Sequence, residues 1–182
     1  PYRLYGSQQD NTAFSLPSSS LRGAITAAEY FEPGGGESGY IAIKPDDNNI
    51  VYGGAIGSGA GHGRLLRFDQ RTNEIRIVTV WPEVHGMGRG AEALKYRFQW
   101  TFPISFSPHD PNTLYVTSNG VHRTRDEGMS WEVISPDLSH NDPETLKPSG
   151  GPITFSGTVR NSGNVALSSV VVRGDAALSD PV

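Results

Sequence analysis

The feature that most constrains the fold is a strand–turn–strand pattern that occurs twice. The first copy covers residues 40–53 and the second covers residues 103–116, and each has a turn rich in Pro, Asp and Asn between two runs of mainly apolar and β-branched residues. Pro45 and Pro108 occupy the same place in the two copies, 63 residues apart. Since Pro, Asp and Asn favour turns and β-branched runs favour strands, both copies predict β-hairpins.

Each hairpin is followed by two further runs with strand character. These runs lie at residues 65–68 and 75–80 after the first hairpin, and at residues 121–125 and 131–134 after the second. A repeating unit of four short strands is typical of a β-propeller blade. The spacing of 63 residues exceeds the roughly 40 to 50 usual for such repeats, which predicts insertions. They are the glycine-rich residues 57–63 and the connection 81–101, in which residues 91–96 form the one predicted helical turn.

The sequence therefore predicts an all-β fold, a β-propeller segment of about two and a half four-stranded blades in an incomplete ring. This partial propeller spans residues 1–153, with blades over residues 1–37 in part, 39–82 and 101–136. A polar loop at residues 135–151 leads to a β-rich tail, residues 154–182. Within the tail, small polar and β-branched residues alternate around Asn161-Ser162-Gly163-Asn164, which predicts a β-hairpin of a sandwich-like module.

The strongest local motif is the Asp-box turn from Thr124 to Trp131, with the sequence Thr-Arg-Asp-Glu-Gly-Met-Ser-Trp. We expect Asp126 to accept backbone N–H bonds across the turn and Gly128 to adopt positive φ. Trp131 is expected to fill the groove between neighbouring strands. The motif as a whole, Thr124 included, is predicted to be structural and to mark a blade rather than an active site.

Residues 2–154 resemble the large bacterial proteins described as sortilin-like or BNR-repeat glycosyl-hydrolase-like propellers. The matching stretches are YGSQQDN at 5–11, GGGESGY at 34–40, LKYRFQWTFP at 94–103 and SGGPIT at 149–154. The resemblance implies a seven- or eight-bladed propeller, often two in tandem, in a much longer exported chain, so we expect an extracellular or periplasmic location. Residues 155–182 depart from that pattern and instead resemble an immunoglobulin-like surface-protein repeat, which leaves either a natural fusion or a sequence assembled from pieces.

Composition excludes several classes of function. The net charge is −4 and the basic residues are scattered, so the sequence shows no basic patch of the kind that binds nucleic acid. The absence of cysteine excludes disulfides and thiolate metal sites. Apolar runs are too short to predict a membrane span. Because the first residue is Pro1 rather than Met, we expect a processed product or a part of a longer polypeptide.

Glycoside hydrolysis requires two carboxylates about 5 to 9.5 Å apart. Four acidic residues in or beside glycine-rich loops are candidates, and their spacing does not select a pair: Asp10, Glu37, Glu83 and Glu92. Candidate ligand-binding side chains are the aromatic sugar-stacking platforms Trp81, Tyr96 and Trp100, together with Arg97. A sialidase binds the carboxylate of its substrate with a cluster of arginines. Arg89 and Arg97 are available for this role, but the sequence does not identify a full arginine triad.

No metal site is predicted. The histidines His62, His85, His109, His122 and His140 show no ligand spacing. The acidic turn with Asp46, Asp47 and Asn49 has calcium-type donors, yet the same residues are ordinary turn formers. No cofactor is expected, with calcium as the open alternative.

Three functions are compatible with these observations. The first is a non-catalytic propeller module that scaffolds an exported or envelope assembly and binds protein or glycan. The second is a glycoside hydrolase of the Asp-box propeller type that uses a carboxylate pair. The third is a segment of a larger complex or fibre, because an incomplete ring leaves strand edges that the remainder of the propeller or other subunits would cover.

Overall fold

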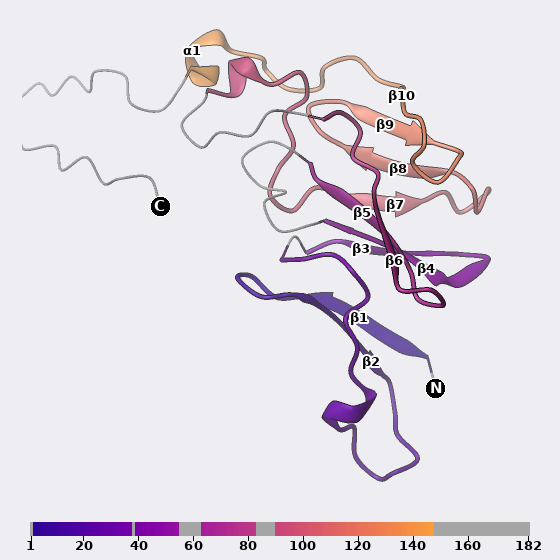
Figure 1. Cartoon of the computed structure of the whole chain (residues 1–182). Helices are drawn as coiled ribbons and strands as arrows, with labels where there is room; N and C mark the ends of the chain where they lie inside the picture. Colours follow the sequence, from indigo (N-terminus) through magenta and orange to yellow (C-terminus); the bar gives the residue numbers. More distant parts are fainter. Residues whose placement is uncertain (1, 38, 55–62, 83–89, 148–182) are drawn as a thin grey trace, which may run out of the picture.

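The fold is all-β, as the computed structural model in Figure 1 shows. It describes residues 2–37, 39–54, 63–82 and 90–147. Three antiparallel sheets succeed one another along the chain, and none of them closes on itself. The first is a hairpin of β1 (Arg3–Ser7) and β2 (Ala13–Pro17).

The other two sheets each have four strands in simple sequential order. One consists of β3 (Ile41–Lys44), β4 (Asp47–Gly54), β5 (Leu65–Asp69) and β6 (Glu74–Ile77). The other consists of β7 (Ile104–Phe106), β8 (Leu114–Thr117), β9 (Val121–Thr124) and β10 (Glu132–Val133). The eight strands of these two sheets lie in or overlap the segments in which the sequence predicts strands.

The repeat seen in the sequence is also a repeat in strand register. Ala42 pairs with Tyr52 between β3 and β4, and Ser105 pairs with Tyr115 between β7 and β8. The two turns differ, because a register shift at Ile43/Lys44 tightens the first. The second turn is wider and is braced by Asp110, whose Oδ2 accepts the Thr113 hydroxyl at 2.6 Å.

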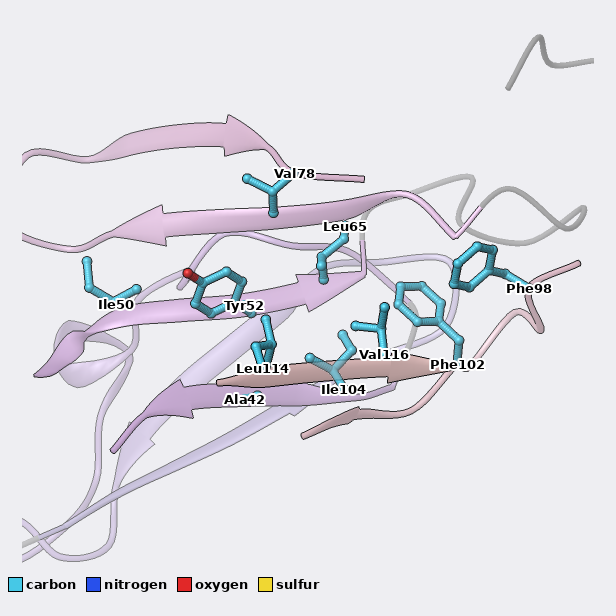
Figure 2. Close-up of a cluster of buried hydrophobic side chains, with 10 residues drawn as sticks. All are labelled: Ala42, Ile50, Tyr52, Leu65, Val78, Phe98, Phe102, Ile104, Leu114 and Val116. Atoms are coloured by element: carbon cyan, nitrogen blue, oxygen red, sulfur yellow. The ribbon is translucent and has the colours of Figure 1, made fainter. Parts of the chain in front are cut away.

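The main core lies between the two four-stranded sheets, where ten side chains are buried (Figure 2). They are Ala42, Ile50, Tyr52, Leu65 and Val78 from the first sheet and its end, and Phe98, Phe102, Ile104, Leu114 and Val116 from the second sheet and the segment before it. The Tyr52 and Phe106 rings meet edge to face at 5.6 Å between their centroids. Strands β3 and β7 approach each other at one edge of this interface.

The second face of the sheet β3–β6 is also buried along β4 and β5, whereas Ile75 and Ile77 of β6 are exposed there. Val51 and Phe68 pair across β4 and β5 on that face, and both are buried. Gly34 lies directly against the Phe68 ring, and the Gly36 N–H donates to the carbonyl of Gly54 at 2.7 Å. The chain after β2 therefore covers this face.

The two four-stranded sheets stack in the same sense. Tyr52 points from its sheet into the interface with the next sheet. The equivalent Tyr115 lies between Leu114 and Val116, whose side chains fill that interface, so Tyr115 points to the opposite, outer face of β7–β10. Each sheet thus presents its tyrosine face forward, away from the preceding sheet.

Three short helical elements interrupt the strands. The predicted turn at 91–96 is shorter, a 3-10 helix η2 (Ala91–Ala93). Two others were not predicted, η1 (Ala27–Glu29) and α1 (Pro143–Leu146). Helix α1 forms because Asp142 caps it by accepting from the Glu144 N–H and Pro143 occupies the first turn. The predicted hairpin in the tail 154–182 lies outside the described residues. In the described part of the chain, no helix has the length and apolarity that crossing a membrane requires.

The chain after β2 can pack on the second face of the sheet β3–β6 because residue 34 is a glycine. Gly34 has φ of 68°, and a Cβ there would come within 2.7 Å of Phe68 Cβ. Gly34→Ala is expected to destabilise the fold by more than the roughly 1 kcal/mol of a positive-φ alanine, because the clash is with a buried side chain. The matched control is Gly23→Ala, with φ of 81° and nothing within 4 Å. Urea unfolding of both variants measures the difference, and equal losses would contradict the packing described.

Candidate functional site

The topology gathers the predicted site residues at one end of the sheets, the end at which β4 and β6 finish. Glu37 follows Gly36, which is bonded to Gly54 at the end of β4. The aromatic candidates Trp81, Tyr96 and Trp100 and the acidic Glu92 all lie in the connection from β6 to β7. In Figure 1 the short turns that join β3 to β4 and β5 to β6 lie at the opposite end.

Asp10 and Glu37 are brought together. Glu37 Oε2 accepts the Asp10 backbone N–H at 2.9 Å and the Gln9 side-chain amide at 3.0 Å. The same amide nitrogen donates to Asp10 Oδ1 at 3.0 Å. The two carboxylates therefore lie within about 6 Å of each other, a separation compatible with the carboxylate pairs of glycosidases.

The surroundings of Glu37 indicate a structural use of its carboxylate. Its side chain is buried among the residues of a turn, with 8% of the residue exposed. Its two N–H donors belong to the turn after β1, where Asp10 holds φ of 57°. A carboxylate that accepts backbone and amide N–H groups braces such a turn. Glu92 is exposed in η2, and Glu83 lies outside the described residues.

Three of the four predicted ligand-binding side chains are engaged within the protein. The Lys95 ammonium lies 3.3 Å from the centre of the Trp81 ring, which occupies one face of that indole. Tyr96 packs edge to face on His122 at 4.5 Å. The Trp100 side chain belongs to a residue that is 37% exposed, and it is the most accessible of these aromatic residues after Trp81.

Arg97 belongs to a polar cluster that the sequence did not suggest. Its Nη2 donates to Asp137 Oδ2 and to the Ser139 hydroxyl, both at 2.8 Å. Asn119 donates to the same Asp137 oxygen at 2.8 Å. Hydrogen bonds from the Ser139 hydroxyl and N–H, with those from Asn119 and Arg97, hold the pKa of Asp137 far below its usual range. The sequence signal for this cluster is the spacing of Asp137-Leu138-Ser139, which is that of an Asx turn. Arg89, the other predicted arginine, lies outside the described residues.

His122 is fully buried on β9 and was not singled out by the sequence. It lies beside Tyr96 and is stacked on Phe98 with ring centres 5.6 Å apart. Its Nε2 is 2.7 Å from the Ser118 hydroxyl, while Nδ1 has no hydrogen-bond partner. Burial lowers the pKa of His122 to about 4, so the ring is neutral at physiological pH.

The acidic turn considered for calcium is neutralised by protein cations. Asp46 pairs with Lys44, and Asp47 pairs with Arg71 at 2.9 Å. Asp47 Oδ1 also accepts the backbone and side-chain N–H groups of Asn49 at 3.1 Å. Across residues 2–37, 39–54, 63–82 and 90–147, no group of three His, Asp or Glu side chains is arranged to hold a metal.

The turn from Thr124 to Trp131 is held by its own polar groups. The Thr124 hydroxyl accepts the Gly128 N–H at 2.9 Å. Asp126 accepts the backbone N–H of Ser130 at 2.9 Å and its hydroxyl at 2.6 Å. Gly128 has φ of 86°, which leaves this position to glycine.

The same turn docks on the preceding sheet. The Trp131 indole N–H donates to the Val78 carbonyl at 3.0 Å, and Gly128 lies against the Val78 side chain. Glu127, at φ of 58°, forms an ion pair of 2.6 Å with Arg67 of β5, which is 7% exposed. Trp131 therefore lies between sheets, and the turn acts as the clamp between β3–β6 and β7–β10.

Comparison with known protein families and with curated proteins finds no match to this chain.

The Glu127–Arg67 pair is expected to hold the two sheets together. Glu127→Gln would leave the buried Arg67 guanidinium uncompensated and destabilise the protein by about 3 kcal/mol. The control is Glu132→Gln, which removes a pair of the same 2.6 Å length to Arg123 with 63% of the Glu132 side chain exposed. That change is expected to cost less than about 1 kcal/mol. Chemical denaturation checks both, and equal costs would contradict a clamping role.

Acid is expected to destabilise the fold through His122. Its pKa falls from 6.5 to about 4 on folding, so the unfolded chain binds the proton more tightly. The stability from the neutral ring is complete above pH 6.5, and up to about 3 kcal/mol is lost as pH falls towards 4. His122→Phe, which retains aromatic packing, should flatten this loss, and His140→Phe at an exposed site should not. Thermal unfolding over pH 4 to 7 measures it; an unchanged pH profile in His122→Phe would contradict the assignment.

Proposed function

We propose that this chain is a segment of a β-propeller of the Asp-box type that acts without catalysis, as a scaffolding and binding module for protein or glycan. One observation carries the architectural part. Two repeated four-stranded sheets stack in the same sense, and the strands β4 and β5 of the sheet β3–β6 are buried on both faces. In a two-sheet sandwich each sheet turns one polar face outward, whereas radial stacking packs the forward face of one sheet on the rear face of the next.

The outer face of β7–β10 supports a role in an assembly. Tyr115 and Ser105 lie on this face, and Arg123 pairs there with Glu132. Same-sense stacking is a head-to-tail contact, which leaves one unmatched face at each end of a stack. In our proposal, further sheets of the propeller or other subunits cover this face, in an exported or envelope setting.

Binding rather than catalysis is favoured by the use of the predicted site residues. Glu37 braces a turn, Arg97 is held by Asp137, and Trp81 is capped by Lys95. These contacts occupy three of the predicted site residues, whereas Asp10, Glu92 and Trp100 remain exposed.

A second candidate function, glycoside hydrolysis, is favoured by the proximity of Asp10 and Glu37. Carboxylate oxygens no more than about 6 Å apart fit the roughly 5 to 5.5 Å of a retaining pair and fall short of the roughly 6.5 to 9.5 Å of an inverting pair.

The purified protein assayed with aryl glucosides, xylosides and sialosides separates the two functions. We expect no product above the uncatalysed rate, and we expect Glu37→Gln to lower the unfolding free energy by about 1 kcal/mol through weakened turn bonds. Glu92→Gln, at an exposed site, is the control for stability. Turnover by the wild-type protein that is abolished in both Glu37→Gln and Asp10→Asn, with both variants folded, would overturn the non-catalytic proposal.

A further inference from the structure

A polar groove lies at the short-turn end of the sheets, remote from the residues predicted as a site. It has a volume of about 460 Å³ and runs between the hairpin β1–β2 and the turns of the sheet β3–β6. Tyr2 and Tyr5 line one side, and Asn48, Asn49 and Gln70 line the other. This volume lies within the range of small-molecule sites.

The groove is held open by a small hydrogen-bond network. Gln70 Nε2 donates to the Tyr5 hydroxyl and to the Asn48 carbonyl, both at 3.3 Å. The Gln70 backbone N–H donates to the Asn49 carbonyl at 2.9 Å. Gln70 therefore joins β1 to the start of β4. Its side-chain amide oxygen accepts no hydrogen bond from the described residues and can accept one from a ligand.

The chemistry of the lining selects a class of ligand. Two tyrosines offer ring surface and hydroxyls, Ile43 adds an apolar patch, and the amides of Asn48 and Gln70 can both donate and accept. Among the residues that the structure describes, no carboxylate and no lysine lines the groove. Arg3 is committed elsewhere, since its guanidinium binds Ser15 and the Glu29 carbonyl and lies over the Phe31 ring.

We propose that this groove binds a neutral sugar unit of a glycan chain, with the tyrosine rings against the sugar face and the amides bonded to its hydroxyls. A polyol needs paired donors and acceptors and little net charge, which this lining supplies. The inference rests on the binding role proposed above and names its ligand. Tyr2, at 74% exposure, lies where a chain of linked sugars would enter and leave.

Titration of the full chain with cellotetraose, xylotetraose and mannotetraose tests the proposal by calorimetry and by saturation-transfer NMR. At least one tetrasaccharide is expected to bind with millimolar or tighter affinity. Asn48→Ala and Tyr2→Ala are expected to weaken that binding tenfold or more, because both side chains line the groove. Tyr40→Ala is the matched control at an exposed tyrosine outside the groove and should leave binding unchanged.

Absence of binding by all three tetrasaccharides would overturn the proposal, as would binding that survives both Asn48→Ala and Tyr2→Ala. Preference for sialyllactose over the neutral tetrasaccharides would overturn the assignment of a neutral ligand. These outcomes are separate from the glycoside assay. A chain that binds nothing in the groove and hydrolyses nothing keeps its proposed scaffolding role, whereas one that hydrolyses glycosides through Glu37 loses it.

Discussion

The buried guanidinium of Arg67 must be neutralised, and its partner comes from a different sheet. Arg67 lies beside Tyr52 across β4 and β5, on the face that meets the next sheet. Glu127 reaches it from the turn between β9 and β10, and the Trp131 indole bonds Val78 nearby. An unpaired charge at that depth would cost several kcal/mol, so the two sheets are fixed in one relative position. The core between them, and the radial stacking we propose, depend on that position.

Much of the fold was predictable because it is specified locally. Turn chemistry at Pro45 and Pro108 and the alternating strands around them determine the hairpins, and the equal spacing carries through to the pairs Ala42–Tyr52 and Ser105–Tyr115. The motif from Thr124 to Trp131 likewise encodes its own positive φ and bonds. What it docks on was not predictable, since Val78 is 53 residues away from Trp131.

The candidate site was predictable as a location but not as a set of free side chains. The connections predicted as insertions follow β4 and β6, and Asp10 and Glu37 do meet near the end of β4. Whether a carboxylate braces a turn or faces a substrate depends on which N–H groups point at it, and the backbone around Asp10 decides that. For Arg97 the deciding partner, Asp137, lies 40 residues further along the chain. Composition and spacing carry no information about such a pair.

The forward faces of the two repeated sheets differ at one charged position, where the first sheet has Arg76 and the second has Glu132. This difference determines which side chains can pack on each face. On β5 and β6, Arg67 lies opposite Arg76, which has Glu74 of its own strand at 3.9 Å. The buried Arg67 takes its acidic partner, Glu127, from the next sheet. On β9 and β10, Arg123 lies opposite Glu132 and is neutralised within its own sheet. A sheet that covered β7–β10 would therefore need no acidic residue at the place of Glu127. Arg67 needs an acidic partner from the next sheet, and Arg123 does not. A further sheet on the outer face of β7–β10 would therefore be held by contacts with Tyr115 and its neighbours.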